Sequence, residues 1–223
     1  MSMKYFEIDW DYDNLDVIGH YPQTSLKKGY NPRLPDSHRQ VKPHSFPDFI
    51  PNLELELHDK AYPTDYIQKF VSFGMVVNTK FKNILKQFKL PPHAFYPIKV
   101  YHKGALLEYF WFHYAINDFF SWLDKEESKA LIYDDKNGVY KVISELNLSL
   151  SLEEIEKINQ KLPWHQHMKW EKIIFKKEFP KYDVYKTRGL DLKNFISERL
   201  LNALLDAGMT GFTSKPIENI ICK

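Results

Sequence analysis

One pair of histidines has a spacing that could bind a metal ion. His165 and His167 are separated by a single residue, so both imidazoles would lie on the same face of an extended strand. Structural and catalytic zinc sites need three or four converging ligands, and the sequence names no third ligand. We therefore interpret the two histidines as exposed loop residues and predict no metal site.

An acidic run near the N-terminus has the spacing that opens a calcium loop. Asp9, Asp11 and Asp13 occupy alternate positions, as the first ligands of an EF-hand do. The glycine of such a loop is missing, and His20 stands where the bidentate glutamate would be. The run is typical of solvated acids.

Two further carboxyl groups could act as a general acid–base pair. Asp118 and Asp124 flank the apolar residues Phe119, Phe120 and Trp122, and an apolar setting raises the pKa of a carboxyl group. Hydrogen bonding within a turn is the interpretation we favour for both. The eight glycines form no phosphate loop or nucleophile elbow, so we predict no catalytic residue and no cofactor.

The clearest electrostatic feature is a stretch that contains lysines and no acid. Between Asp65 and Glu108 there is no aspartate or glutamate. Such a field could steer an acidic partner, although charge runs are more often solvated faces. The candidate partner-binding residues are Lys80, Lys82, Lys86, Lys89, Lys99 and Lys103. Aromatic residues among these lysines could also stack on single-stranded nucleic acid, but the net charge of +2 argues against that role.

Two distant stretches are written in the same pattern and predict the elements that position these residues. In residues 76–85 and 195–204, two apolar residues precede Asn78 or Ser197, and helical periodicity follows. Each stretch predicts a strand, an N-cap and a helix, and Pro91-Pro92 is expected to stop the first helix. Duplication and shared capping chemistry both explain the likeness.

The remaining patterns indicate strands, most of them paired as hairpins. Residues 96–102 and 106–116 flank Lys103-Gly104, and the second run is so aromatic that we expect it at the centre of the core. Residues 131–133 and 139–143 predict a second hairpin, and 171–177 and 183–187 predict a third strand pair. Ser151 and Glu154 form a capping box. The fold class is therefore α+β, a single domain with a mainly antiparallel sheet and a few short helices.

Composition limits the setting of the protein. The 223 residues can bury a hydrophobic core large enough to fold without disulfides or metal ions. The single cysteine, Cys222, has no partner within the chain. Residues 20–63 are rich in proline and predict an irregular surface segment, and its part from His20 to Pro51 is a second candidate for partner contact. The N-terminal residues carry acids instead of an apolar run, and no apolar stretch is long enough to cross a membrane. We expect a cytoplasmic protein.

The ending of the chain resembles the closing motif of a known group of proteins. Residues 196–200 and 203–212, together with 76–85 and 95–100, are similar to the immunity proteins of bacterial polymorphic toxin systems, the eleventh immunity family and its relatives. The likeness covers about residues 70–103 and 191–217, and the first sixty-odd residues show none. Its motifs are caps and turns, which identify a scaffold better than a binding site.

The resemblance implies a non-enzymatic protein that neutralises a cognate toxin, encoded beside it, by stoichiometric occlusion. Three alternatives remain from the residues alone. These are a small enzyme of unknown reaction, a nucleic-acid-binding module and a structural subunit of a secretion apparatus.

Overall fold

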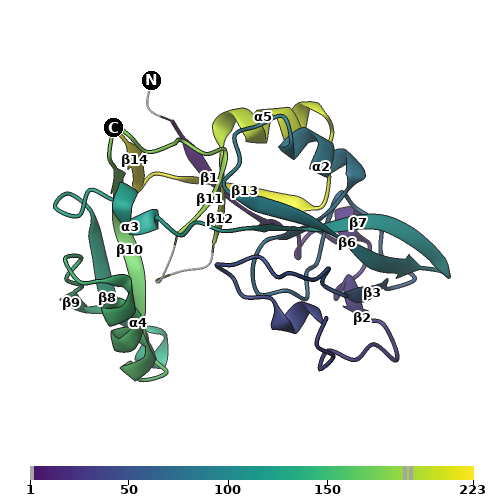
Figure 1. Ribbon diagram of the computed structural model, residues 1–223, viewed down its shortest axis with the longest axis horizontal. Helices are drawn as coiled ribbons and strands as arrows, with labels where there is room; N and C mark the ends of the chain where they lie inside the picture. Colours follow the sequence, from purple (N-terminus) through teal and green to yellow (C-terminus); the bar gives the residue numbers. More distant parts are fainter. Residues whose placement is uncertain (1–2, 188–189, 191–192) are drawn as a thin grey trace.

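The strands of the protein form three sheets, and the computed structural model describes residues 3–187, 190 and 193–223 (Figure 1). The largest sheet has the order β2 (Thr24–Leu26), β3 (Glu54–Leu57), β6 (His93–His102), β7 (Ala105–Tyr114), β5 (Met75–Asn78), β4 (Tyr66–Ile67). The second has the order β11 (Val184–Lys186), β12 (Asn194–Ser197), β1 (Tyr5–Trp10), β13 (Phe212–Ile217). The third has the order β14 (Ile220–Cys222), β10 (Gln166–Phe175), β8 (Lys129–Asp134), β9 (Lys141–Glu145).

Helices are few and short, and most strands pair antiparallel, which confirms the predicted α+β class. Among the described strands, only β3–β6 and β10–β14 pair in parallel. The α-helices are α1 (Leu15–Ile18), α2 (Thr79–Leu85), α3 (Phe119–Trp122), α4 (Leu152–Lys161) and α5 (Glu198–Asp206). Short 3-10 turns occur at His38–Gln40 and Lys136–Gly138. No helix among the described residues is long and apolar enough to cross a membrane.

The aromatic strand β7 lies between two cores, as expected for a central strand. Phe112 and Tyr114 belong to the larger core, whereas Tyr109 and Trp111 belong to a smaller one on the opposite face. The strand alternates in this way because successive side chains of a strand point to opposite faces. Its hairpin with β6 is confirmed, and the two turn residues, Lys103 and Gly104, both have the positive φ of a tight hairpin turn.

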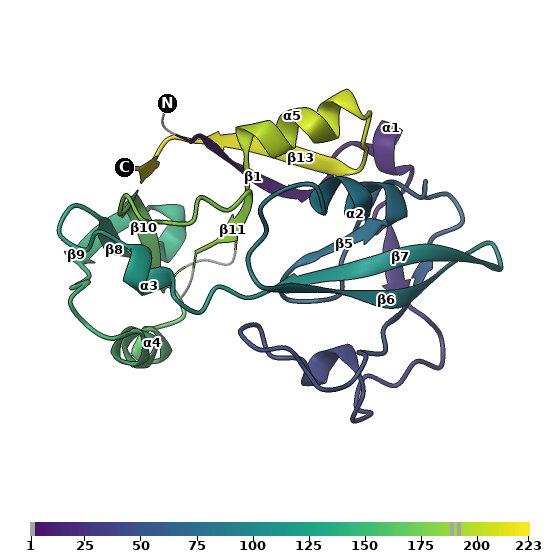
Figure 2. The same ribbon diagram turned by 45° about the horizontal axis from the view of Figure 1, so that its top comes forward.

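The two predicted strand–cap–helix units are also confirmed. Asn78 Oδ1 accepts a hydrogen bond from the N–H of Phe81 at 3.0 Å, and Ser197 Oγ accepts one from the N–H of Leu200 at 3.2 Å. Each cap satisfies one of the free N–H groups that open a helix. The helices α2 and α5 that follow lie side by side on the same side of the molecule (Figures 1 and 2).

The likeness of the two units extends well beyond their caps. Residues 75–98 correspond to residues 194–217 without a gap. Both β5 and β12 pair with a short strand on one side, β4 or β11, and with a long strand on the other, β7 or β1. The two prolines of the units also have equivalent partners, because Pro97 opposes Phe110 across β6 and β7, and Pro216 opposes Phe6 across β13 and β1. The second unit is thus completed by the first strand of the chain.

Matched hydrogen bonds hold the short strand of each unit. Tyr109 Oη donates to the carbonyl of Thr64 at 2.6 Å, and Tyr5 Oη donates to the carbonyl of Tyr182 at 2.7 Å. In both units the next residue is an aspartate, whose carbonyl accepts from the N–H of the N-cap residue at 2.9 Å. The same geometry therefore recurs at three positions in each unit, namely the cap, the tyrosine and the aspartate.

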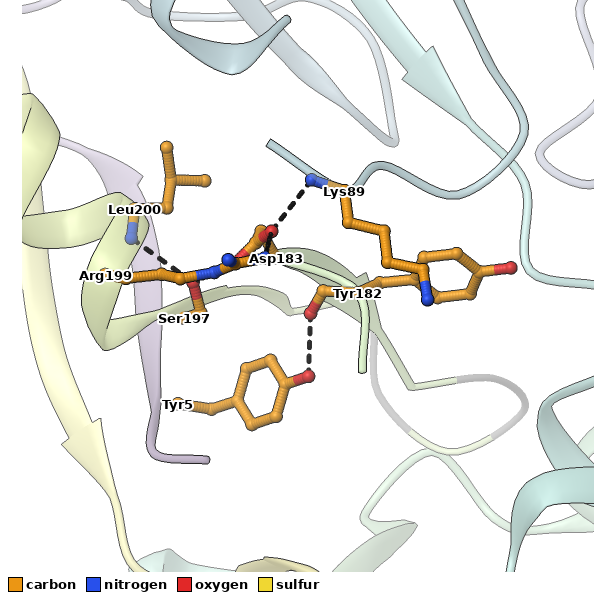
Figure 3. Close-up of polar contacts among 7 residues, drawn as sticks. All are labelled: Tyr5, Lys89, Tyr182, Asp183, Ser197, Arg199 and Leu200. Atoms are coloured by element: carbon orange, nitrogen blue, oxygen red, sulfur yellow. Dashed lines mark hydrogen bonds and ion pairs between the residues drawn. The ribbon is translucent and has the colours of Figure 1, made fainter. Parts of the chain in front are cut away.

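These two aspartates, Asp65 and Asp183, tie the units to each other. Asp65 Oδ1 accepts from Asn78 Nδ2 at 2.8 Å, and its Oδ2 accepts from the N–H of Thr210, beyond the end of α5, at 2.8 Å. Asp183 Oδ1 accepts from Ser197 Oγ at 2.6 Å, and its Oδ2 accepts from the N–H of Lys89, beyond the end of α2, at 2.8 Å (Figure 3). We call this arrangement the crossed clasp.

The first helix ends earlier than predicted, and the crossed clasp explains why. Helix α2 ends at Leu85, well before Pro91-Pro92. The N–H groups of Gln87 and Phe88 bond to carbonyls three residues back, which tightens the turn, and the N–H of Lys89 then bonds to Asp183. The chain leaves the helix because its N–H groups find other acceptors, so the prolines are not needed to stop it.

A second correction concerns the predicted pairing of residues 171–177 with 183–187, which is wrong. Strand β10 pairs with β8 and β14, whereas β11 pairs with β12 in another sheet. Both segments are strands, but Asp183 is held at the exit of α2, so the chain after it enters the second sheet. The hairpin of β8 with β9 and the capping box of Ser151 and Glu154 are confirmed.

The proline-rich segment contributes strands β2 and β3 and also covers a buried histidine of β7. The ring centroid of Phe46 lies 4.9 Å from that of His113, and Lys186 Nζ donates to the carbonyl of Pro43 at 3.1 Å. Burial, together with the nearby charge of Lys186, lowers the pKa of His113 from 6.5 to about 4. His113 is therefore neutral in the folded protein near neutral pH.

We predict that Asp183→Asn destabilises the protein by about 3 kcal/mol, because it removes a buried carboxylate from Arg199 and leaves buried donors badly matched. The side chain of Asp183 is fully buried, whereas Asp65 is only partly buried. Asp65→Asn should therefore cost about 1 kcal/mol. Urea unfolding of both variants measures the difference, and equal losses would show that the two halves of the crossed clasp are equivalent.

We also predict an acid-labile contribution from His113. Because its pKa in the folded state lies below its ordinary value, this contribution is complete above about pH 6.5 and is lost as the pH falls towards 4. The wild type should lose roughly 2 kcal/mol more than His113→Phe between about pH 7 and pH 4.5. Parallel loss of stability in both proteins, measured by urea unfolding, would contradict this assignment.

Candidate functional site

The predicted lysines are placed around α2 and the β6–β7 hairpin. Lys80 and Lys82 belong to α2, and Lys86 and Lys89 follow it. Lys99 lies on β6 and opposes Glu108, whose Oε2 accepts from the hydroxyl of Thr79 in α2 at 2.6 Å. Lys99 is thus on the face that α2 covers, while Lys103 lies in the hairpin turn.

A groove occupies the part of this face that α2 leaves open. The half of the hairpin near its turn extends past α2 (Figure 2). The groove has a volume of about 670 Å³ and is bounded by the β6–β7 hairpin and by residues 50–53, which lead into β3. Its lining is Asp36, Ile50, Pro51, Asn52, Leu53, Pro97, Ile98, Lys99, Leu106, Leu107, Glu108, Tyr109 and Phe110. We call it the hairpin groove.

Of the predicted lysines, Lys99 lines the hairpin groove, and Lys82 contacts Phe110, one of its lining residues. Lys82 Nζ lies 3.2 Å from the centroid of the Phe110 ring, and partial burial lowers the pKa of this lysine. Lys99 Nζ forms an ion pair with Glu54 at 2.9 Å, and that hydrogen bond raises its pKa. Lys80, Lys82, Lys86, Lys89 and Lys103 are not among its lining residues, and Lys82 reaches it only through Phe110. The structure therefore unites only part of the predicted set.

The second unit shows how unusual the position of Lys82 is. Leu201 of α5 occupies the corresponding position and is buried in the larger core. The contact of Thr79 with Glu108 has a counterpart in the ion pair of Lys4 with Glu198, at 3.6 Å. The scaffold is the same, but in α2 a lysine covers an aromatic ring where α5 packs an apolar side chain.

The predicted carboxylate pair does not form an acid–base site. Asp118 Oδ2 accepts from Trp122 Nε1 at 2.6 Å, and Asp124 Oδ2 accepts from Lys223 Nζ at 2.8 Å. The hydrogen bond with Lys223 lowers the pKa of Asp124, and its Oδ1 accepts from the N–H of Glu127 at 3.2 Å, which agrees with the favoured interpretation of hydrogen bonding within a turn. Its carboxyl group faces an ammonium group at the surface instead of an apolar pocket.

The histidine pair lies beside two aspartates at the end of β8. His165 Nε2 lies 3.5 Å from Asp134 Oδ2, and His167 Nδ1 lies 4.0 Å from Asp135 Oδ2. Within the part of the chain that the structure describes, no three His, Cys, Asp or Glu side chains are grouped to hold a metal ion. In the acidic run, Asp9 and Asp11 accept hydrogen bonds from nearby backbone N–H groups.

Sequence reasoning missed two apolar surfaces. The hairpin groove joins Ile50 to Leu106 and Phe110, and no local pattern brings these distant residues together. The other surface includes Trp164, which is 93% exposed, and the β9 hairpin, where Val139, Tyr140, Val142 and Ile143 are also exposed. Exposed apolar residues of this kind are more frequent at interfaces than elsewhere on a surface.

The two units form a scaffold with a concave surface, which Lys99 lines and beside which Lys82 covers Phe110. The model of the Imm11 immunity protein family matches residues 4–219, so the chain belongs to that family. The match includes the first sixty-odd residues, where no resemblance was seen in the sequence. The search of curated proteins gave no match.

We predict that Lys82→Leu leaves the fold intact and changes the free energy of unfolding by less than about 1 kcal/mol. The corresponding Leu201 shows that the scaffold accepts leucine at this position, and new apolar contact with Phe110 offsets the lost cation–π contact. Urea unfolding measures the change. A loss above about 2 kcal/mol would mean that the lysine supports the fold.

Proposed function

We propose that this chain binds a cognate toxin protein and neutralises it by stoichiometric occlusion, without catalysis. Its membership of an immunity protein family is the observation that carries the proposal. The partner would be the product of the neighbouring gene, and together the two proteins would belong to a bacterial polymorphic toxin system. Their complex would form in the cytoplasm. Occlusion of a toxin needs a binding surface on a rigid scaffold. The two strand–cap–helix units, joined by the crossed clasp, provide such a scaffold.

The surface that we assign to toxin binding lies around α2 and the β6–β7 hairpin. It carries Lys80, Lys82, Lys86, Lys89, Lys99 and Lys103, and the chain has no acid between Asp65 and Glu108. A field of one sign raises the rate of encounter with an oppositely charged surface. The partner surface should therefore be acidic.

Co-expression tests the function directly. The chain is produced with the polypeptide encoded by the neighbouring gene, and growth and complex formation are followed together. Protection of growth and a one-to-one complex would support the proposal. Toxicity without protection, or protection without a complex, would overturn neutralisation by occlusion.

We predict that Lys82→Glu with Lys86→Glu slows association with the toxin about tenfold at low salt and flattens its salt dependence. The charge change removes attraction that acts over distance, so the two proteins should associate at similar rates in high salt. Stopped-flow mixing at several salt concentrations measures the rates.

The matched control is Lys172→Glu with Lys177→Glu, which changes the net charge equally at exposed positions in and just after β10. This control should associate nearly as fast as the wild type. An equal slowing by both double variants would show that only net charge matters, and no slowing by either would remove the α2 surface from the proposal.

A further inference from the structure

We propose that the hairpin groove receives an aromatic side chain of the toxin, and that an adjacent carboxylate of the toxin pairs with Lys82. This inference rests on the proposed function and specifies which part of the lysine-bearing surface supplies most of the binding energy. Its elements are the shape of the groove, the state of Lys82 and the contrast between the two units.

The hairpin groove combines apolar contact area with a concave shape. Leu106 and Ile50, which line it, are 61% and 69% exposed, and the lining residues Phe110 and Pro97 oppose each other across paired strands. Large apolar side chains that stay exposed in a concavity release water when a partner covers them. A volume of about 670 Å³ accommodates one aromatic side chain with its neighbours. Pockets of this kind hold the anchor residues of protein interfaces.

The charge beside the groove selects an acidic partner. Lys82 Nζ lies over Phe110, and its partial burial disfavours the ammonium ion. Glu108, the acid whose charge acts on this lysine, already accepts a hydrogen bond from Thr79. A carboxylate of the partner would form an ion pair with Lys82. Because the partner would exclude water from this surface, the ion pair would be stronger there than in bulk solvent.

The second unit serves as an internal control for this assignment. There the leucine that corresponds to Lys82 is buried, and the pair that corresponds to Glu108 and Thr79 is a simple surface ion pair. Packing and folding therefore do not require the lysine at this position. A lysine laid on an aromatic ring beside an open apolar groove is a feature of one unit only, which is what a binding role predicts.

The decisive variant is Leu106→Glu, which places an acid in the groove at a position exposed enough for the fold to tolerate it. The matched control is Leu205→Glu, on the exposed face of α5, where the side chain is 56% exposed. The control therefore replaces an exposed leucine with the same acid at a position outside the groove lining. Circular dichroism and urea unfolding confirm that both variants fold.

Binding to the toxin is measured by surface plasmon resonance, with growth protection measured in parallel. We expect Leu106→Glu to raise Kd about 100-fold, mainly through faster dissociation, and Lys82→Leu to raise it about tenfold. Leu205→Glu should bind within about twofold of the wild type. Wild-type binding with an unchanged Kd for Leu106→Glu would overturn the groove and leave the proposed function standing.

A probe that needs no toxin separates the remaining outcomes. Anilinonaphthalene sulfonate carries an aromatic group and a negative charge, and its fluorescence rises in apolar sites. The wild type and Leu205→Glu should bind it, whereas Leu106→Glu and Lys82→Leu should bind it more weakly. Equal binding by all four proteins would overturn the recognition of an anionic aromatic group.

Two other occupants are judged by the same proteins. A wild type that is dimeric by light scattering, with Leu106→Glu monomeric, would assign the groove to a second copy of the chain and overturn its role in toxin binding. If the wild type neither binds nor protects against the toxin, the proposed function fails, and the groove's role in toxin binding fails with it.

Discussion

The interaction on which the rest of the structure depends is the buried carboxylate of Asp183. It accepts hydrogen bonds from the cap residue of α5, from the backbone at the exit of α2 and from the guanidinium of Arg199 (Figure 3). A carboxylate without these donors could not remain buried, because its desolvation would cost several kcal/mol. The donors come from distant parts of the chain, so satisfying one charge fixes the start of one helix against the end of the other.

The two halves of the crossed clasp give a physical reason to prefer duplication over shared capping chemistry. Capping alone would explain Asn78 and Ser197, since many helices begin with such residues. It does not explain why Tyr109 and Tyr5 donate to equivalent carbonyls, or why each aspartate reaches the exit of the other helix. The most economical origin is a duplicated unit of two strands, a helix and two strands, in which the chain's first strand completes the second copy.

Local signals were sufficient where a few neighbouring residues determine the geometry. The caps of α2 and α5, the tight turn at Lys103-Gly104 and the aromatic alternation of β7 were all readable from the sequence. Partners distant in the chain were not readable, so the pairing of β10 and β11 was wrong, and the exit of α2 was assigned to prolines instead of Asp183. The groove was missed for the same reason, because Ile50 and Leu106 are far apart in the chain and line one groove only through the pairing of β3 with β6.

The division between scaffold and site follows from these constraints. Residues in the crossed clasp cannot vary freely, since each serves both units, whereas the turn of the β6–β7 hairpin projects away from α2 and α5 (Figure 2). Changes there leave the cores and the buried carboxylate untouched. The lining of the hairpin groove lies largely outside the crossed clasp, so the two features occupy different parts of the structure. A substitution in the groove can therefore change this surface without disturbing the fold that presents it.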